Sequence, residues 1–231
     1  RAESSGVEVN QDRRQLELKL SRALPDWSGR KMSGWLSFEI DELDVRHDGS
    51  LAREDRLRSL LAGTSVSWRG GVRQHLLTVE ADIGLDAFGS QLENYVTPGD
   101  GRRNDYLIAR LQYVDLTRLN ERWSLRLDTY AQYSADVLPS VKRFKVGGGR
   151  IGRGFDAAAL AGDRGLGGKI ELRRRYGGEL PVVEWLDTYL FYDIGAAWQE
   201  NMPGRESAAS TGMVASPVII GPVAMLGFLD S

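Results

Sequence analysis

The chain of 231 residues contains no cysteine and only two histidines. Without cysteine it can hold neither a disulfide framework nor a zinc site built on thiolates. The histidines, His47 and His75, stand apart and form no His-x-His or His-x₃-His pair of the kind that binds a metal ion. Two isolated histidines also give no basis for a Ser/His/Asp catalytic set. The sequence therefore indicates no metal, no cofactor and no enzyme.

Long hydrophobic runs and a strong charge imbalance are absent as well. No apolar stretch reaches the roughly 18 residues that a transmembrane helix needs, and the nearest approach, 213–229, is broken by Pro217, Gly221 and Pro222. The N-terminal residues are polar and contain no apolar signal-peptide core. Because the chain does not begin with Met, we interpret its start as internal or processed. A formal net charge of −2 gives no reason to expect binding to nucleic acid.

Several long segments instead show apolar and polar residues in alternation, the period of a β-strand. Three of them run for roughly ten residues or more, where soluble strands average about five to six. Their polar faces carry charges of both signs, as in strands with one face to lipid and one to a water-filled lumen. In 123–133 the apolar face begins with Trp123 and ends with Tyr133, a spacing that suits the two membrane interfaces. The pattern predicts an antiparallel transmembrane β-barrel, with a soluble antiparallel sheet as the alternative. The alternating segments are 16–20, 36–41, 77–86, 107–113, 123–133 and 186–198.

Turn signals separate these segments in the manner of an up-and-down barrel made of hairpins. Short breaks are predicted at 26–34, 69–71 and 176–178, and longer polar loops at 97–101 and 202–204. One weak helical pattern covers 51–61. No linker and no internal repeat is visible, so we expect a single domain over 1–231.

The segment 144–155 is the most unusual part of the chain, with five glycines and two arginines between a strand and a small-residue loop. Glycines at this density allow a tightly folded backbone, which predicts a constrained functional loop. Gly147, Gly149 and Gly152 also match the G-x-G-x-x-G fingerprint of dinucleotide sites, with Glu171 about twenty residues on. That fingerprint requires a crossover helix directly after it. None is predicted here, so we expect no nucleotide.

Two charges could meet across this loop. Arg153 lies within it, and Asp193 lies on a predicted strand with Gly195 on the same face. A charge on a lumen wall needs water or a partner, and arginine offers a two-pronged donor to a carboxylate. From the residues alone, two separately solvated charges remain the alternative to an Arg153–Asp193 ion pair.

Five segments form a further pattern: 123–125, 132–139, Phe144-x-x-Gly147-Gly148, Arg153-Gly154-Phe155 and Gly162-Asp163-Arg164-Gly165. Together they resemble the outer-membrane transporters of two-partner secretion, the haemolysin secretion/activation family of the Omp85 superfamily. The segment Tyr189 to Gly195 resembles a later barrel-strand motif of the same family. The resemblance is good over roughly 75–200 and weaker in the earlier strands.

The resemblance implies a 16-stranded barrel in the outer membrane of a Gram-negative bacterium. It would export a partner exoprotein, a haemolysin or adhesin, without nucleotide, and would contact outer-membrane lipid. The barrel-assembly machinery would insert it. A long loop, about 139–166 here, would fold back into the barrel so that its arginine pairs with the strand aspartate. The residues implied are Gly147, Gly148, Gly152, Arg153, Gly154, Phe155, Gly162, Asp163 and Gly165 in the loop, and Phe191, Asp193 and Gly195 on the barrel wall.

The chain departs from this family in extent. We expect six strands before the long loop and two or three after it, about 8–10 of the 16. We find no POTRA domain and no last strand ending in an aromatic residue. The chain therefore resembles a shortened C-terminal barrel portion that is not an active transporter alone. The alternatives are an outer-membrane protein assembly insertase of the same superfamily and a soluble β-sheet binding protein.

Overall fold

The computed structural model describes residues 9–96, 98–180, 183–199, 212–215 and 219–224, and within them every regular element is a β-strand. None of the described residues forms a helix long and apolar enough to cross a membrane. The strands are β1 (Val9–Trp27), β2 (Arg30–His47), β3 (Ser50–Gly70), β4 (Arg73–Gly84), β5 (Gln91–Asn94), β6 (Leu107–Arg118), β7 (Trp123–Ser134), β8 (Phe144–Val146), β9 (Leu160–Gly162), β10 (Arg164–Leu180), β11 (Val183–Trp198), β12 (Gly212–Ala215) and β13 (Ile219–Ala224).

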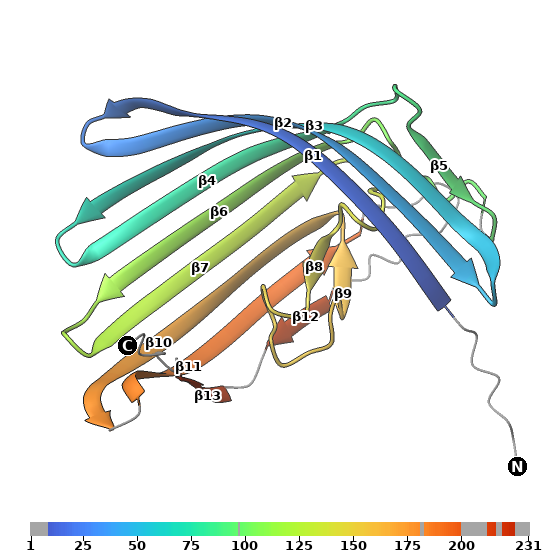
Figure 1. The fold of residues 1–231 in the computed structure, drawn as a ribbon. Helices are drawn as coiled ribbons and strands as arrows, with labels where there is room; N and C mark the ends of the chain where they lie inside the picture. The colour runs from blue at the N-terminus through green and yellow to red at the C-terminus, as the bar shows by residue number, and fades with distance from the viewer. Residues whose placement is uncertain (1–8, 97, 181–182, 200–211, 216–218, 225–231) are drawn as a thin grey trace, which may run out of the picture.

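The long strands form one antiparallel sheet in the order β1-β2-β3-β4-β6-β7-β10-β11-β12, with β5 added to β3 and β13 to β11. Neighbours in the sheet are therefore neighbours along the chain, which is the topology of successive hairpins. Figure 1 shows the sheet curved into an open arch, with β1 at one edge and β11 to β13 at the other. The small β8–β9 hairpin lies on the concave side of this arch.

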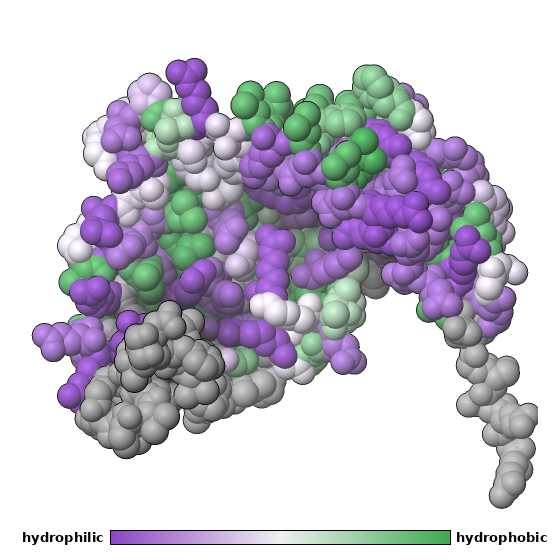
Figure 2. Space-filling model, viewed as in Figure 1, coloured by the Kyte–Doolittle hydropathy of each residue, from purple (hydrophilic) through white to green (hydrophobic). Residues whose placement is uncertain are grey.

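The convex face of the sheet is apolar because the strand register aligns the hydrophobic residues of successive strands. Leu18 pairs with Phe38, Phe38 with Leu60, Leu60 with Ile83, and Ile83 with Leu107. Leu18 is 76% exposed and Leu107 is 56% exposed. Figure 2 shows hydrophobic side chains along the top of the arch. A continuous exposed apolar surface of this kind marks a contact with lipid or with another protein.

The concave face carries charged side chains that bind one another from strand to strand. Arg110 donates hydrogen bonds to Glu80 at 2.8 Å, to Asp82 at 3.0 Å and to Gln132 at 3.1 Å. Asp128, whose side chain is fully buried, accepts two hydrogen bonds from Arg126. In Figure 2 the side chains around the hollow beneath the arch are mostly hydrophilic. The predicted alternation of an apolar face and a charged face is thus confirmed.

The predicted strands are present, but they are longer than expected and two local predictions were wrong. Residues 51–61 form no helix; they belong to β3, which pairs with β2 almost residue by residue. The apparent helical spacing arose because Leu57 and Leu61 face one side of the strand and Leu60 the other. Residues 176–178 are not a break either, because β10 continues to Leu180.

Other boundaries shifted by a few residues. The break predicted at 26–34 is reduced to a two-residue turn, since β1 ends at Trp27 and β2 begins at Arg30. In the described part of the chain, six long strands precede the loop that follows β7, as predicted, and the short β5 is an addition. The strand predicted near 207–216 corresponds to β12, and the loop predicted at 202–204 lies outside the described residues.

Candidate functional site

The segment between β7 and β10, residues 135–163, folds back over the concave face of the sheet (Figure 1). The loop was expected at about 139–166; its last three residues belong instead to β10. Within the loop, β8 and β9 pair with each other, with Phe144 opposite Gly162 and Val146 opposite Leu160. This hairpin holds the glycine-rich turn at its tip.

Glycine is required at three positions of this turn, Gly147, Gly148 and Gly152. Gly147 has φ of 107° and Gly152 has φ of 83°, backbone conformations that other residues rarely adopt. The N–H of Gly147 donates to the carbonyl of Ile151 at 2.8 Å, and the N–H of Phe155 donates to the carbonyl of Gly152 at 3.0 Å. These two bonds close the turn on either side of Gly152. The turn therefore fixes where Arg153 points.

Arg153 binds Asp193 of β11 with both its side chain and its backbone. Its guanidinium donates from Nη2 to Asp193 Oδ1 at 2.9 Å and from Nε to Oδ2 at 3.1 Å. The backbone N–H groups of Gly152 and Arg153 donate to the same Oδ2 at 3.0 and 3.1 Å. The Asp193 side chain is fully buried and that of Arg153 is 20% exposed. One buried carboxylate thus fastens the tip of the loop to the wall of the sheet.

Two further wall residues complete the environment of Arg153. Glu171 of β10 accepts a hydrogen bond from Arg153 Nη1 at 3.0 Å. The ring of Phe191 lies beneath the guanidinium, whose carbon is 3.5 Å from the ring centroid. Arginine is suited to this place because it can bind two carboxylates in its plane and stack on an aromatic face at the same time.

Glycines on the wall make room for the apolar side of the loop. A Cβ on Gly165 would lie 2.0 Å from the Phe144 ring, and one on Gly195 would lie 2.9 Å from Val146. A Cβ on Gly167 would meet Ile151 at 2.5 Å. The loop side chains can therefore touch the backbone of β10 and β11 directly. The buried apolar cluster comprises Tyr130, Phe144, Val146, Ile151 and Ala197.

Gly162 and Asp163 secure the return of the loop into β10. Gly162 lies so close to the backbone of Trp198 that a Cβ would be 2.5 Å from its carbonyl oxygen. Asp163 is fully buried and accepts a hydrogen bond from the backbone N–H of Leu138 at 2.9 Å. Its Oδ1 is also 3.4 Å from Arg143 Nε. Asp163 thus ties together the start and the end of the loop.

The remaining predicted loop residues are less involved in packing. Gly148 has φ of 90°. It is held in the turn by a hydrogen bond from its N–H to the carbonyl of Phe155 at 3.3 Å. Gly154 links Arg153 to Phe155. Phe155, which the resemblance places in the loop motif, is 38% exposed. The buried apolar contacts come from Val146 of β8 and from Ile151 of the turn, which lie against Gly195 and Gly167 of the wall.

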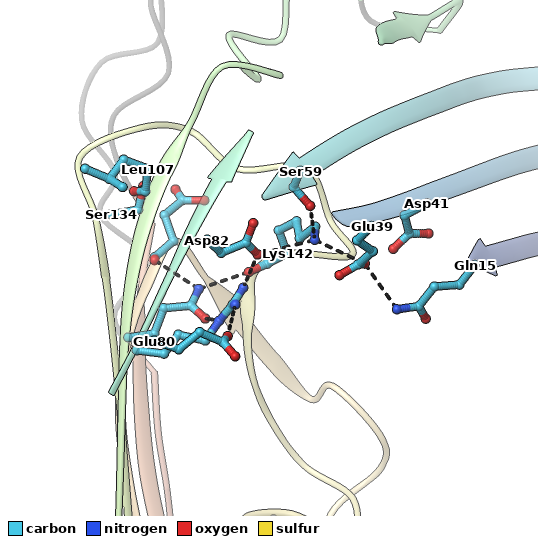
Figure 3. A network of polar contacts seen from close by, with 12 residues as sticks. Gln15, Glu39, Asp41, Ser59, Glu80, Asp82, Leu107, Ser134 and Lys142 are labelled. Carbon is cyan, nitrogen blue, oxygen red and sulfur yellow. Dashed lines mark hydrogen bonds and ion pairs between the residues drawn. The ribbon is translucent and has the colours of Figure 1, made fainter. Parts of the chain in front are cut away.

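Sequence reasoning missed Lys142, the residue that fastens the root of the loop. Its side chain is 5% exposed. The ammonium lies 3.2 Å from Glu39, 3.2 Å from Ser59 and 3.3 Å from Asp82. Figure 3 shows Lys142 among these polar side chains. These partners come from β2, β3 and β4. The carbonyl of Lys142 also accepts a hydrogen bond from Gln132 of β7 at 3.0 Å.

The loop is therefore fastened at two points on opposite parts of the arch. Lys142 binds the wall formed by the earlier strands, whereas Arg153 binds β10 and β11. No local signal in the sequence marks Lys142, because Glu39 lies 103 residues away and Asp82 lies 60 residues away. Only the pairing of the strands brings these carboxylates to the lysine.

The chain is similar to known secretion proteins in sequence and in fold. A family model described as "Haemolysin secretion/activation protein ShlB/FhaC/HecB" matches residues 4–216. The hemolysin transporter protein HpmB of Proteus mirabilis is 33% identical over 102 residues, which cover 41% of this chain and 17% of HpmB. This match therefore involves only a small part of HpmB.

Two solved structures share the fold. CdiB from Escherichia coli superposes with a TM-score of 0.76 at 18% identity, covering 96% of this chain and 41% of that one. CdiB from Acinetobacter baumannii gives a TM-score of 0.62 at 19% identity, covering 93% and 37%. This likeness confirms the predicted fold class, an antiparallel sheet of the Omp85 barrel type, here an open one. The chain spans less than half the length of each of these relatives. Because the family model covers most of its residues, the chain belongs to the ShlB/FhaC/HecB family of haemolysin secretion/activation proteins.

Proposed function

We propose that this chain forms part of the wall of an outer-membrane pore that exports a partner exoprotein in two-partner secretion. The observation that carries the proposal is the inward-folded loop, held to a charged concave wall by the Arg153–Asp193 ion pair. A loop anchored in this way lies where an exported polypeptide would pass. The membership of the chain in a family of secretion proteins favours export over the assembly of other barrels.

The two faces of the sheet suit the two environments of such a pore. The convex face presents exposed leucines such as Leu18, Leu107 and Leu166 to lipid. The concave face presents ion-paired residues such as Arg110, Arg126 and Asp128, which keep a lumen wet. Export along this face is passive and uses neither a nucleotide nor a catalytic residue. The soluble-sheet alternative does not explain why the large apolar side chains lie exposed on the convex face.

Localisation and partners follow from the same proposal. The chain would lie in the outer membrane in contact with lipid, and the barrel-assembly machinery would insert it. The exported partner is a haemolysin or an adhesin. Since the chain spans 41% of the E. coli CdiB chain, we refer the activity to the full-length protein.

The proposal is tested by deleting the gene and measuring the partner exoprotein in the medium and in the periplasm. We expect export to stop and to return when the full-length wild-type protein is supplied. Unchanged export after deletion would contradict the proposal. A general fall in other outer-membrane barrels, with export secondary to it, would favour the assembly insertase instead.

A further inference from the structure

The concave face contains a cavity of about 640 Å³ at the end of the sheet where short turns join β3 to β4 and β6 to β7. Figure 1 shows these turns at the left, away from the β8–β9 hairpin. Arginine dominates the cavity lining, with Glu121 and Asp187 as the carboxylates in it. The lining arginines are Arg69, Arg118, Arg122, Arg126, Arg173 and Arg175.

Three of these arginines are neutralised by carboxylates of the wall. Arg126 binds Asp128 at 2.7 Å. Arg173 binds Glu171 at 2.6 Å and Arg175 binds Asp187 at 2.9 Å. These pairs hold the guanidinium groups in place along β7 and β10. They add rigidity to the cavity without adding net charge.

The excess positive charge comes from the other three, Arg69, Arg118 and Arg122. Within the described part of the chain, none of the three forms a salt bridge. Among the described residues of the lining, Glu121 is the one acidic residue that is not already bound to one of the wall arginines. The whole chain has a formal net charge of −2, so this concentration of cations is local. Anionic groups entering the cavity would be attracted, and the attraction would fall with added salt.

The cavity is also connected to the loop through shared partners. Glu171 accepts one hydrogen bond from Arg173 at 2.6 Å and another from Arg153 at 3.0 Å. Arg173 lines the cavity, whereas Arg153 holds the tip of the loop. An anion bound to Arg173 would therefore be linked to the attachment of the loop through the side chain of Glu171.

We propose that this cavity is an entry site that binds acidic segments of the exported polypeptide, an inference that rests on the proposed export function. The arginines lie on the concave face, where the polypeptide would pass, and not on the apolar convex face, where lipid phosphates would lie. Arginine presents paired donors to carboxylates, which suits Asp and Glu side chains of an extended segment. Such a site would select and retain acidic stretches as they enter the pore.

The test uses the full-length protein in planar bilayers and a peptide of alternating Glu and Ser. We expect this peptide to block the ion current from the side of the short turns and not from the other side. A peptide of the same length with alternating Lys and Ser should not block. The substitutions Arg118→Gln and Arg122→Gln should each weaken the block by about fivefold. This factor corresponds to the interaction energy of one pair of unit charges in contact in water. Both positions lie at a turn, so the fold should be retained.

The control is Arg46→Gln. It removes an exposed arginine near the C-terminal end of β2, at the end of the sheet away from the cavity, and should leave the block unchanged. Calorimetric titration of the same peptides in detergent gives an affinity that does not depend on conductance. Equal binding of both peptides, or no loss of affinity in the double variant, would overturn the inference. If the arginines instead bind the protein preferentially to anionic vesicles, the site is a lipid site and the inference is overturned as well. Export of the exoprotein without peptide binding would contradict the entry site and leave the proposed function intact.

Discussion

Arg153 and Asp193 are joined by two side-chain hydrogen bonds of 2.9 and 3.1 Å, and the backbone N–H of Arg153 donates to the same carboxylate. The two residues lie 40 positions apart, on the loop and on β11. Asp193 is fully buried, so it depends on Arg153 and on the loop backbone for neutralisation and for hydrogen bonds. The carboxylate of Asp193 thus holds the loop in position, and the loop in turn allows this charge to be buried.

Removal of either partner should release the loop. We expect Arg153→Ala and Asp193→Ala each to impair export and to destabilise the barrel by about 3–5 kcal/mol, the usual result of leaving one charge of a buried pair alone. The double variant should lose much less than the sum, with a coupling of roughly 0.5–3 kcal/mol. Thermal loss of the folded band on gels measures the stability, and export measures the function.

The matched control for this cycle is the exposed pair formed by Arg103 and Asp105, whose side chains are 54% and 48% exposed. Alanine at either position should change stability by less than about 1 kcal/mol. Simple additivity of Arg153→Ala and Asp193→Ala would show that the two residues act separately.

Filling a glycine space on the wall should displace the loop without touching a charge. Gly165→Ala places a methyl group 2.0 Å from the Phe144 ring, which must then leave its pocket. We expect a loss of about 1–3 kcal/mol, the typical effect of overpacking, together with greater protease access to the loop. Gly149→Ala is the control, because no atom lies within 4 Å of a Cβ there. Equal protease access in the two variants would argue against direct packing of the loop on β10.

Lys142→Met should loosen the root of the loop. The change leaves Glu39 without its cation, while Asp82 keeps Arg110. A loss of about 3–5 kcal/mol is expected for a buried carboxylate left unpaired. Lys145→Met, on the same loop but exposed, should have little effect. A Lys142→Met barrel as stable as the wild type would show that this network contributes nothing to holding the loop.

Substitutions at two adjacent residues of β11 test which face of this strand meets lipid. Leu190 points to the convex face, whereas Tyr189 stacks on Phe191 on the concave side. If the convex face meets lipid, Leu190→Lys should destabilise the barrel by about 2–4 kcal/mol. Tyr189→Lys should be much milder, because water reaches that face. Similar losses for both, measured by refolding into lipid vesicles, would contradict the assignment of the faces.

Much of this architecture could be predicted from the sequence because the strands repeat every second residue over long distances. The limits of the strands are harder to predict, because glycines such as Gly177 and Gly178 are typical of a break and yet lie within β10. Gly63 of β3 shows why glycine misleads here. A Cβ at this position would lie 2.2 Å from the ring of Trp35, so the glycine provides space within a continuous strand.

The site was predictable only in part, because some of its residues meet partners that lie far away in the sequence. Arg153 and Asp193 stand out because each belongs to a short, unusual segment of glycines and aromatics. Lys142 belongs to no such segment, and its carboxylate partners on β2 and β4 lie far away in the sequence. Val146 and Ile151 likewise gain their role only once the loop folds onto Gly195 and Gly167.

Site-specific crosslinking can decide whether an exported polypeptide passes along the concave face, as we propose. A photoreactive amino acid is placed at Arg126, on the concave face, or at its neighbour Leu127, which is 37% exposed on the convex face. The full-length protein then exports an exoprotein stalled by a folded domain at its end. We expect a crosslinked adduct with the exoprotein from position 126 and none from position 127. Absence of an adduct at 126, or equal adducts at both positions, would contradict it.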